Sequence, residues 1–196
     1  ELETNYMVND MLDLMFVASF GNWKFDGDAN GNYQETEYNS EGQAIGYTTT
    51  EYAYALDGLY VGDMPQTSYV LGVTLKPIKD LRIQAIHKMY DKNYSDWSPS
   101  AREFDGTNDD ADRAQVWEAP SYNRLDLHMS YKLPKVKDLD MMLTANIFNV
   151  LDEVYVQDAV DNSQYNGYGS KNHLPHNAEV FLGTPRYANI GLSIGF

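Results

Sequence analysis

Apolar and polar residues alternate strictly along the last nine positions of the chain. One face collects five apolar residues, namely Ala188, Ile190, Leu192, Ile194 and Phe196, and the residues between them are small or polar. A period of two predicts a β-strand with one apolar face and one small or polar face. Similar alternation upstream predicts about seven strands, near residues 2–8, 12–20, 68–76, 81–90, 124–133, 139–148 and 188–196.

In the segment 124–133 the polar face is mostly charged. The apolar positions are Leu125, Leu127, Met129, Tyr131 and Leu133, and the positions between them hold Arg124, Asp126, His128, Ser130 and Lys132. A dry core would have to pair each of these polar groups. We therefore expect this face to meet water as a salt-linked lumen surface, and we expect the apolar face to be covered by something else.

Short and long connections between the predicted strands alternate along the chain. The short ones are turns rich in Pro, Asp and Lys, at 9–11, 77–80 and 134–138, and the long ones are polar stretches at 25–66, 91–121 and 152–185. Outer-membrane barrels have short periplasmic turns and long external loops. The sequence therefore predicts an all-β fold of antiparallel transmembrane β-barrel strands, with the last strand descending to a periplasmic C-terminus.

Composition is compatible with this prediction and excludes some function classes. The 29 acidic residues outnumber the 14 basic ones, for a formal charge of −15, which argues against nucleic acid as a partner. Without cysteine the chain can form neither a disulfide nor a thiolate metal site. Mean hydropathy is only −0.52, but alternating barrel strands dilute the apolar signal, and 16 tyrosines suit the aromatic girdles of barrels.

One acidic segment matches the calcium-loop pattern D-x-[DN]-x-[DN]-G-x5-E in full. The candidate ligands are Asp26, Asp28, Asn30, Asn32 and Glu37, and Gly31 at the sixth position would permit the sharp turn that the loop needs. No amphipathic helix follows, as it would in an EF-hand. The alternative is an acidic external hairpin loop in which Asn30-Gly31 is only a turn signal.

Other candidate sites have simpler explanations. His173 and His176 lack a nearby carboxylate in the sequence, so we interpret them as ordinary loop residues and not as a metal site. Loop tyrosines could stack on sugar rings or on an aromatic siderophore, although girdle positions and packing among the loops explain most of them; they are Tyr47, Tyr52, Tyr54, Tyr60, Tyr155, Tyr165 and Tyr168. We find no nucleophile elbow, phosphate loop or metalloprotease helix and expect no enzyme activity.

Several short motifs carry a resemblance to a known family. The stretch 146–152, followed by Tyr155, and the ending 181–187 with 192–196 resemble the penultimate and last strands of TonB-dependent outer-membrane receptors. The segment 60–67 and the opening 1–24 are similar to receptors of this type from Bacteroidota. The resemblance spans essentially the whole chain.

The resemblance implies a 22-stranded barrel with an N-terminal plug, importing a scarce nutrient such as a siderophore or a glycan across the bacterial outer membrane. Because single-chain barrels have even strand numbers, seven strands favour the C-terminal portion of such a barrel, with the plug absent from residues 1–196. Implied partners are outer-membrane lipid, the rest of the barrel, the plug, TonB and a surface lipoprotein. The alternatives are a small self-contained barrel with a structural or adhesin role, whose eighth strand lies near residues 47–56, and a soluble ligand-binding β domain.

The resemblance also assigns a role to the last strand. Its apolar residues, with the terminal aromatic, are expected to form the signal that the barrel-assembly machinery reads; they are Ile190, Leu192, Ile194 and Phe196. A terminal aromatic would also serve as an anchor at the membrane interface.

Overall fold

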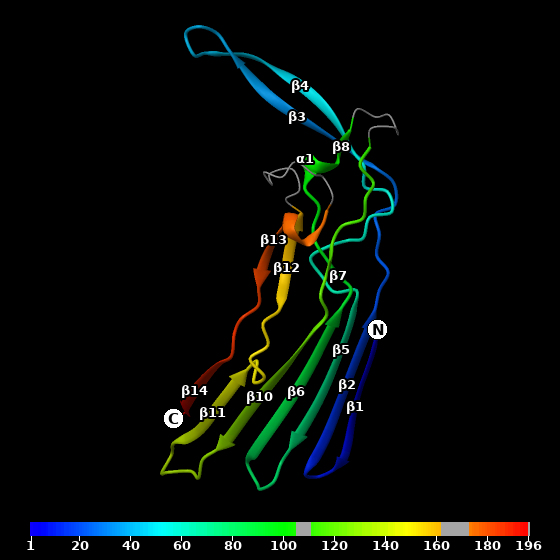
Figure 1. The fold of residues 1–196 in the computed structure, drawn as a ribbon. Coiled ribbons are helices and arrows are strands. Elements are labelled where there is room, and N and C mark those ends of the chain that lie inside the picture. The colour runs from blue at the N-terminus through cyan, green and yellow to red at the C-terminus, as the bar shows by residue number, and fades with distance from the viewer. Residues whose placement is uncertain (105–110, 162–172, 196) are drawn as a thin grey trace.

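The computed structural model describes residues 1–104, 111–161 and 173–195. Its main feature is one antiparallel seven-stranded sheet in the order β1-β2-β5-β6-β10-β11-β14, which forms the lower part of the molecule in Figure 1. The strands are β1 Leu2–Asn9, β2 Leu12–Phe20, β5 Thr67–Leu75, β6 Leu81–Asp91, β10 Tyr122–Lys132, β11 Asp140–Phe148 and β14 Tyr187–Gly195. All seven predicted strands are confirmed, as is the all-β antiparallel fold class.

The strand register keeps the two faces of the sheet chemically distinct. One row of paired residues crosses all seven strands and is apolar throughout. This apolar row is Tyr6, Leu14, Val73, Ala85, Leu127, Ile147 and Ala188. The next row lies on the opposite face, because successive side chains of a strand alternate. This polar row, in which only the first residue is apolar, is Met7, Asp13, Thr74, Gln84, His128, Asn146 and Asn189.

Hydrogen bonds join neighbouring side chains along the polar row. Gln84 donates to the Thr74 hydroxyl at 3.1 Å, His128 Nδ1 lies 2.8 Å from Asn146 Oδ1, and Asn146 Nδ2 donates to Asn189 Oδ1 at 2.8 Å. Cross-strand pairs of this kind stabilise a sheet. The polar face is thus an ordered hydrogen-bonded surface.

The apolar face is not covered by any other part of the described chain. Its side chains are exposed on inner and edge strands alike: Leu71 in β5 retains 51% of its accessible surface and Ile190 in the edge strand β14 retains 79%. The buried apolar residues lie almost entirely in the long connections, among them Ala55, Leu59 and Val116. The core of the chain therefore sits beyond one end of the sheet, and the sheet itself has none.

The connections differ sharply at the two ends of the sheet (Figure 1). At one end the strand pairs β1–β2, β5–β6 and β10–β11 are joined by the predicted short turns. At the other end the long connections are structured. The first holds β3 Ala29–Tyr38 and β4 Ala44–Tyr54; the second holds β7 Asn93–Tyr94, α1 Pro99–Arg102, β8 Glu103–Phe104 and β9 Glu118–Ala119; the third holds β12 Val156–Asp161, the 3-10 turn Pro175–Asn177 and β13 Ala178–Leu182.

The position of β4 corrects one alternative from the sequence. Residues 47–56 are largely in a strand, but β4 pairs with β3 and β8 and does not join the seven-stranded sheet. Polar residues line both faces of β4, so it has no continuous apolar face to add to the sheet. An eighth sheet strand from this segment is therefore wrong.

Among the described residues, no helix has the length and apolar character needed to cross a membrane.

Candidate functional site

The three long connections pack together into one body above the sheet, which we call the loop module (residues 21–66, 92–121 and 149–186, as far as described). Its buried apolar side chains come from all three connections: Ala55, Leu56, Leu59, Tyr94, Ala101, Val116, Ala119, Tyr155 and Ala159. Loops carried on a rigid scaffold are where binding residues commonly gather. The loop module is therefore the candidate functional site.

Backbone contacts fix the three connections to one another. A Cβ atom on Gly62 would lie 2.8 Å from the Asp96 nitrogen and the Ser95 oxygen, so the first connection approaches the second too closely for any side chain. Asp96 in turn donates its N–H to Ala159 at 2.8 Å and accepts from Asp161 at 2.9 Å. The segment 60–67, noted above for its resemblance, thus holds a structural junction.

Gln66 joins the last residue of the first connection to its beginning. Its side chain is 1% exposed, accepts the Trp23 N–H at 2.9 Å and donates to the Trp23 carbonyl at 2.9 Å. One buried amide thereby satisfies a donor and an acceptor of a neighbouring chain segment.

Most loop tyrosines in the described residues pack within the module. Tyr60 stacks on Tyr94 with centroids 4.1 Å apart, and the Lys24 ammonium lies 4.4 Å above the Tyr60 ring. Burial raises the pKa of Tyr94 far above its usual range. Tyr155 stacks on Tyr122 at 4.2 Å. Packing among the loops explains the ring of Tyr60, and packing against the first residue of β10 explains that of Tyr155. Tyr47 is 66% exposed on β4, and Tyr165 and Tyr168 lie outside the described residues.

A buried charged cluster joins the second and third connections. His173 is 4% exposed; its Nδ1 contacts a carboxylate oxygen of Asp161 and its Nε2 lies 2.9 Å from Asp112 Oδ2. Arg102 is fully buried and donates to the Asp112 carbonyl at 2.9 Å. Hydrogen bonding to Asp161 raises the pKa of His173 above its usual value. Burial lowers the pKa of Arg102.

The two histidines noted in the sequence have different environments. His173 is buried in this cluster, whereas His176 is exposed in the 3-10 turn. The carboxylates that contact His173 belong to Asp112 and Asp161, which are distant from it in the sequence, and only the fold brings them close to it. In the described residues no group of three or more His, Asp or Glu has the arrangement of a metal site.

A second buried junction joins the polar face of the sheet to the third connection. Asp126 is fully buried and pairs with Lys88 at 3.1 Å and with Arg124 at 3.2 Å. It also accepts the Asn149 N–H at 2.9 Å. Arg124 extends the junction by donating to the Tyr155 hydroxyl at 3.1 Å. The predicted salt linkage of Arg124 and Asp126 is confirmed.

The other two predicted lumen residues are linked differently. Lys132 reaches Asp140 at 3.5 Å near the short turns. His128 hydrogen-bonds to the neutral amide of Asn146, so its link is not a salt bridge.

The motif segments 146–152 and 181–187 bind to each other directly. Asn149 has a positive φ of 50°, and its side-chain amide donates to the carbonyls of Glu153 at 2.9 Å and Thr184 at 3.1 Å. The carboxylate of Asp152 accepts the Arg186 N–H at 3.0 Å. Asn tolerates left-handed backbone and satisfies nearby backbone groups, which accounts for its place at this turn.

The candidate calcium loop is not formed. Residues 29–38 are the extended strand β3, in which each residue advances the chain by about 3.3 Å, so Asn30 and Glu37 lie far apart. Asp28 is instead held by Arg113, whose two terminal nitrogens each donate to its carboxylate at 2.8 Å. The structure therefore does not bring Asp26, Asp28, Asn30, Asn32 and Glu37 together. The alternative of an acidic hairpin is correct, although the chain turns at residues 39–43 and not at Asn30-Gly31.

The expected assembly-signal residues lie on the edge strand β14. Ile190, Leu192 and Ile194 are on the apolar face, paired with Ala145, Leu143 and Met141, and all three are more than half exposed. Phe196 lies outside the described residues. Their role in assembly remains a prediction.

No family model and no curated protein matches the chain. Among solved structures, the closed form of the ferric-catecholate import receptor Fiu from Escherichia coli K12 is similar in fold, with a TM-score of 0.42 and 16% identity. The similarity covers 98% of this chain and 27% of that one, so the chain spans about a quarter of the receptor's length. Likeness at this level assigns no function.

Proposed function

We propose that the chain forms part of the wall and the external loops of an outer-membrane receptor barrel that takes up a scarce nutrient, such as a siderophore or a glycan. The observation that carries this proposal is the pair of adjacent rows across the sheet, one apolar in all seven strands and one polar and hydrogen-bonded.

Lipid is the cover that best fits the apolar face. A continuous apolar surface exposed to water is unfavourable at about 25 cal/mol per Å², and soluble proteins rarely expose one this extended. A barrel wall resolves the problem because its outer face meets lipid and its inner face meets water or a plug. The remaining strands of the barrel would pair with the edge strands β1 and β14, since a membrane-embedded sheet cannot leave edges open.

The two ends of the sheet would face opposite sides of the outer membrane. The short turns suit the periplasm, and the loop module suits the external surface, where its packed connections would hold cargo-contacting residues in place. TonB, a plug and a surface lipoprotein are the partners that this assignment brings with it. The proposal gives the chain a role in binding and passage and no catalytic step.

Lipid exposure can be tested with single cysteines, because the chain has none of its own. We would place Cys at Ala85 in the apolar row and at the adjacent Gln84 in the polar row of the intact protein. Each would be labelled with an environment-sensitive fluorophore after reconstitution into vesicles with spin-labelled acyl chains. We expect quenching for Ala85→Cys and little for Gln84→Cys. Equal quenching at both positions, or none at either, would contradict a barrel wall.

Sidedness is tested separately in whole cells. Glu41→Cys lies in the turn between β3 and β4, and Lys79→Cys lies in the short β5–β6 turn. A membrane-impermeant maleimide should label Glu41→Cys on intact cells and Lys79→Cys only after the outer membrane is opened. The reverse pattern would invert the orientation.

A further inference from the structure

We propose that the β3–β4 hairpin (residues 29–54) is a docking arm for a second protein, which adds an extended strand with basic residues at alternate positions to the free edge of β3. The placement of this arm outside the cell rests on the proposed function, but the surface itself does not. Strand addition to an exposed edge is a general mode of recognition, in which main-chain hydrogen bonds give affinity and alternate side chains give specificity.

The first observation is that the hairpin projects away from the rest of the loop module (Figure 1). Its strands pair with each other from Ala29 and Tyr54 to Tyr38 and Ala44. Beyond its root nearly every residue is exposed on both strands. A two-stranded ribbon standing alone in water is only marginally stable, so a further strand would stabilise it.

The second observation is that β3 has a free edge. In the part of the chain that the structure describes, the order in this small sheet is β3-β4-β8, so no strand pairs with the outer side of β3. Every second residue of β3 therefore directs its backbone N–H and C=O groups outward. Strand edges are commonly blocked by Lys or Pro, and β3 contains neither.

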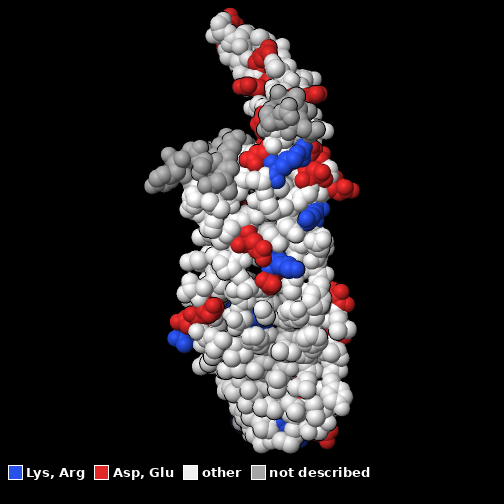
Figure 2. Space-filling model, turned by 45° about the vertical axis from the view of Figure 1, so that its right-hand side comes forward, with Lys and Arg blue, Asp and Glu red and all other residues white. Residues whose placement is uncertain are grey.

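The third observation is the charge of the arm. Residues 29–54 contain four glutamates and no Lys, Arg or His. None of these glutamates forms an ion pair with any residue that the structure describes. Figure 2 shows acidic residues along the projecting arm and basic residues only from its root downward. Like charge disfavours a second copy of this chain as the occupant, whereas a basic strand is complementary.

Side-chain spacing then specifies the partner strand. Tyr33, Glu35 and Glu37 share one face of β3 because they alternate along it, and Tyr33 is 54% exposed. A strand laid along this edge would place its own alternate residues beside them. Lys or Arg at every second position would meet Glu35 and Glu37, and its aliphatic stem would cover Tyr33.

The test uses a fluorescent nine-residue peptide of alternating Lys and Val and the intact protein in detergent, with anisotropy as the readout. We expect saturable binding that weakens about tenfold in the Glu35→Gln/Glu37→Gln variant. The charge-matched control Glu41→Gln/Glu51→Gln removes the same charge from the turn and from β4, away from the β3 edge, and should weaken binding much less. The same peptide methylated on every backbone nitrogen keeps its charge but has no N–H group with which to pair as a strand on either edge, and should not bind.

Three results would overturn the docking arm. The first is that the alternating peptide does not bind. The second is that both glutamine variants lose the same amount of affinity, and the third is that the methylated peptide binds as well as the parent peptide. The last two results would mean that binding is general charge attraction. Hydrogen exchange gives an independent readout, because bound peptide should protect amides of β3 more than those of β4. If the docking arm fails this test, the proposed barrel wall is not affected, because peptide binding in detergent does not depend on how the sheet is oriented in a membrane.

Discussion

Gly183 lies where the ring of Tyr155 leaves no room for a side chain. A Cβ at this position would overlap the Tyr155 ring, and the Gly183 N–H donates to the Tyr155 carbonyl at 2.9 Å. We expect Gly183→Ala to displace Tyr155 from its stack on Tyr122 and to destabilise the protein by about 1–3 kcal/mol, as overpacking commonly does. Thermal unfolding of the intact protein would measure the loss. Gly46→Ala is the matched control, since nothing lies within 4 Å of that position, and a comparable loss there would contradict this explanation.

We expect the stability of the loop module to depend on pH through His173. Its folded-state pKa is raised above the unfolded value of about 6.5, chiefly by the hydrogen bond to Asp161. The stabilisation is therefore complete below pH about 6.5 and is lost as the pH rises through the folded-state pKa. Asp161, Asp112 and Arg102 are the charged groups around the ring; the two carboxylates favour the imidazolium, and the guanidinium opposes it.

The measurement is amide protection in β12 and β13, corrected for the intrinsic pH dependence of exchange. We expect protection to fall with rising pH in the parent protein and to stay flat, at a lower level, in His173→Gln. His176→Gln changes a histidine that is exposed nearby and should retain the parental profile. A pH-dependent profile in His173→Gln would show that another group is responsible.

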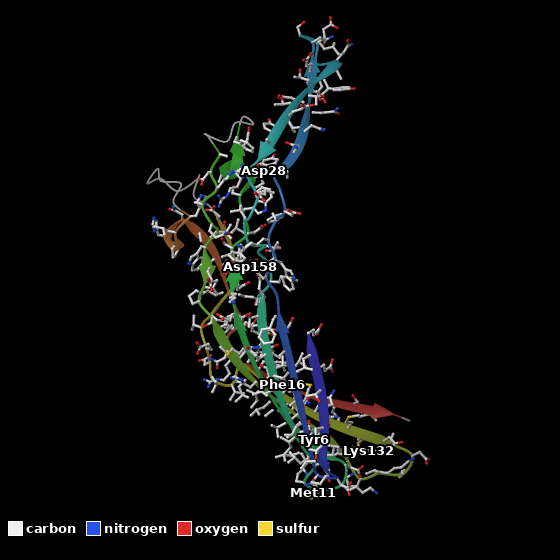
Figure 3. All side chains as sticks on the ribbon, turned by 90° about the vertical axis from the view of Figure 1, so that its right-hand side faces the viewer. Tyr6, Met11, Phe16, Asp28, Lys132 and Asp158 are labelled. Atoms are coloured by element: carbon white, nitrogen blue, oxygen red, sulfur yellow. The ribbon has the colours of Figure 1, made fainter. Side chains whose placement is uncertain are left out.

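At the scale of elements, the hairpin is fixed at its root by Asp28. Arg113 donates two hydrogen bonds to its carboxylate, and the N–H groups of Leu56 and Asp57 donate two more at 3.0 and 3.1 Å. The Arg113 guanidinium holds the pKa of Asp28 well below its usual range. Figure 3 places Asp28 at the base of the projecting hairpin, far from Met11 and Lys132. Because its partner Arg113 belongs to the second connection, this interaction orients the arm relative to the rest of the loop module.

We therefore expect Asp28→Asn to loosen the arm without unfolding the sheet. Spin labels on cysteines at Glu41 and Lys79 would report this as a broader distance distribution in pulsed electron resonance. Asp26→Asn, for which the structure shows no comparable contacts, should leave the distribution narrow. Because the pKa is lowered, acid should reproduce the effect of Asp28→Asn as the pH falls below about 3.8 and through the folded-state pKa. An unchanged distribution in Asp28→Asn would mean that backbone pairing alone orients the arm.

The strands of the sheet could be predicted because each has a period of two, and burial of one face against any apolar medium enforces that period. The hairpin could not be predicted in the same way. Residues 29–54 carry polar groups on both faces, so their hydrophobic periodicity does not indicate a strand. Gly31 also suggests a turn in the sequence, although it lies inside β3. The buried charged cluster could not be predicted from the sequence either, because Asp112, Asp161 and His173 become neighbours only when two long connections pack together. The motif residues Asn149 and Arg186 could be recognised, but their contacts could not.

At the scale of the whole molecule, the negative charge lies almost entirely in the long connections. Residues 21–66, 92–121 and 149–186 carry 20 acidic and 6 basic residues, whereas the seven strands with their short turns carry 9 and 8. In the proposed barrel, a nearly neutral wall would avoid charge at the lipid boundary, and the acidic connections would attract cationic partners over the range of a Debye length. This distribution agrees with both the barrel wall and the basic partner strand.

The two faces of the sheet should respond oppositely to the same new charge. Ala145 lies on the apolar face between Met129 and Ile190, and Thr144 lies next to it on the polar face between Ser130 and Gly191. Arginine on a lipid-facing barrel position near the bilayer centre costs about 2–4 kcal/mol, whereas a lumen position can hydrate it. We expect Ala145→Arg to lower the urea midpoint of the intact protein in vesicles, followed as loss of the folded form on gels, and Thr144→Arg to change it much less. Both substitutions add the same charge to the same strand, so net charge cannot explain a difference. Strand propensity would favour the opposite difference, because Thr is a better strand former than Ala and its replacement should cost more. Equal destabilisation would mean that both faces are packed against protein, and a larger effect at Thr144 would place lipid on the other side.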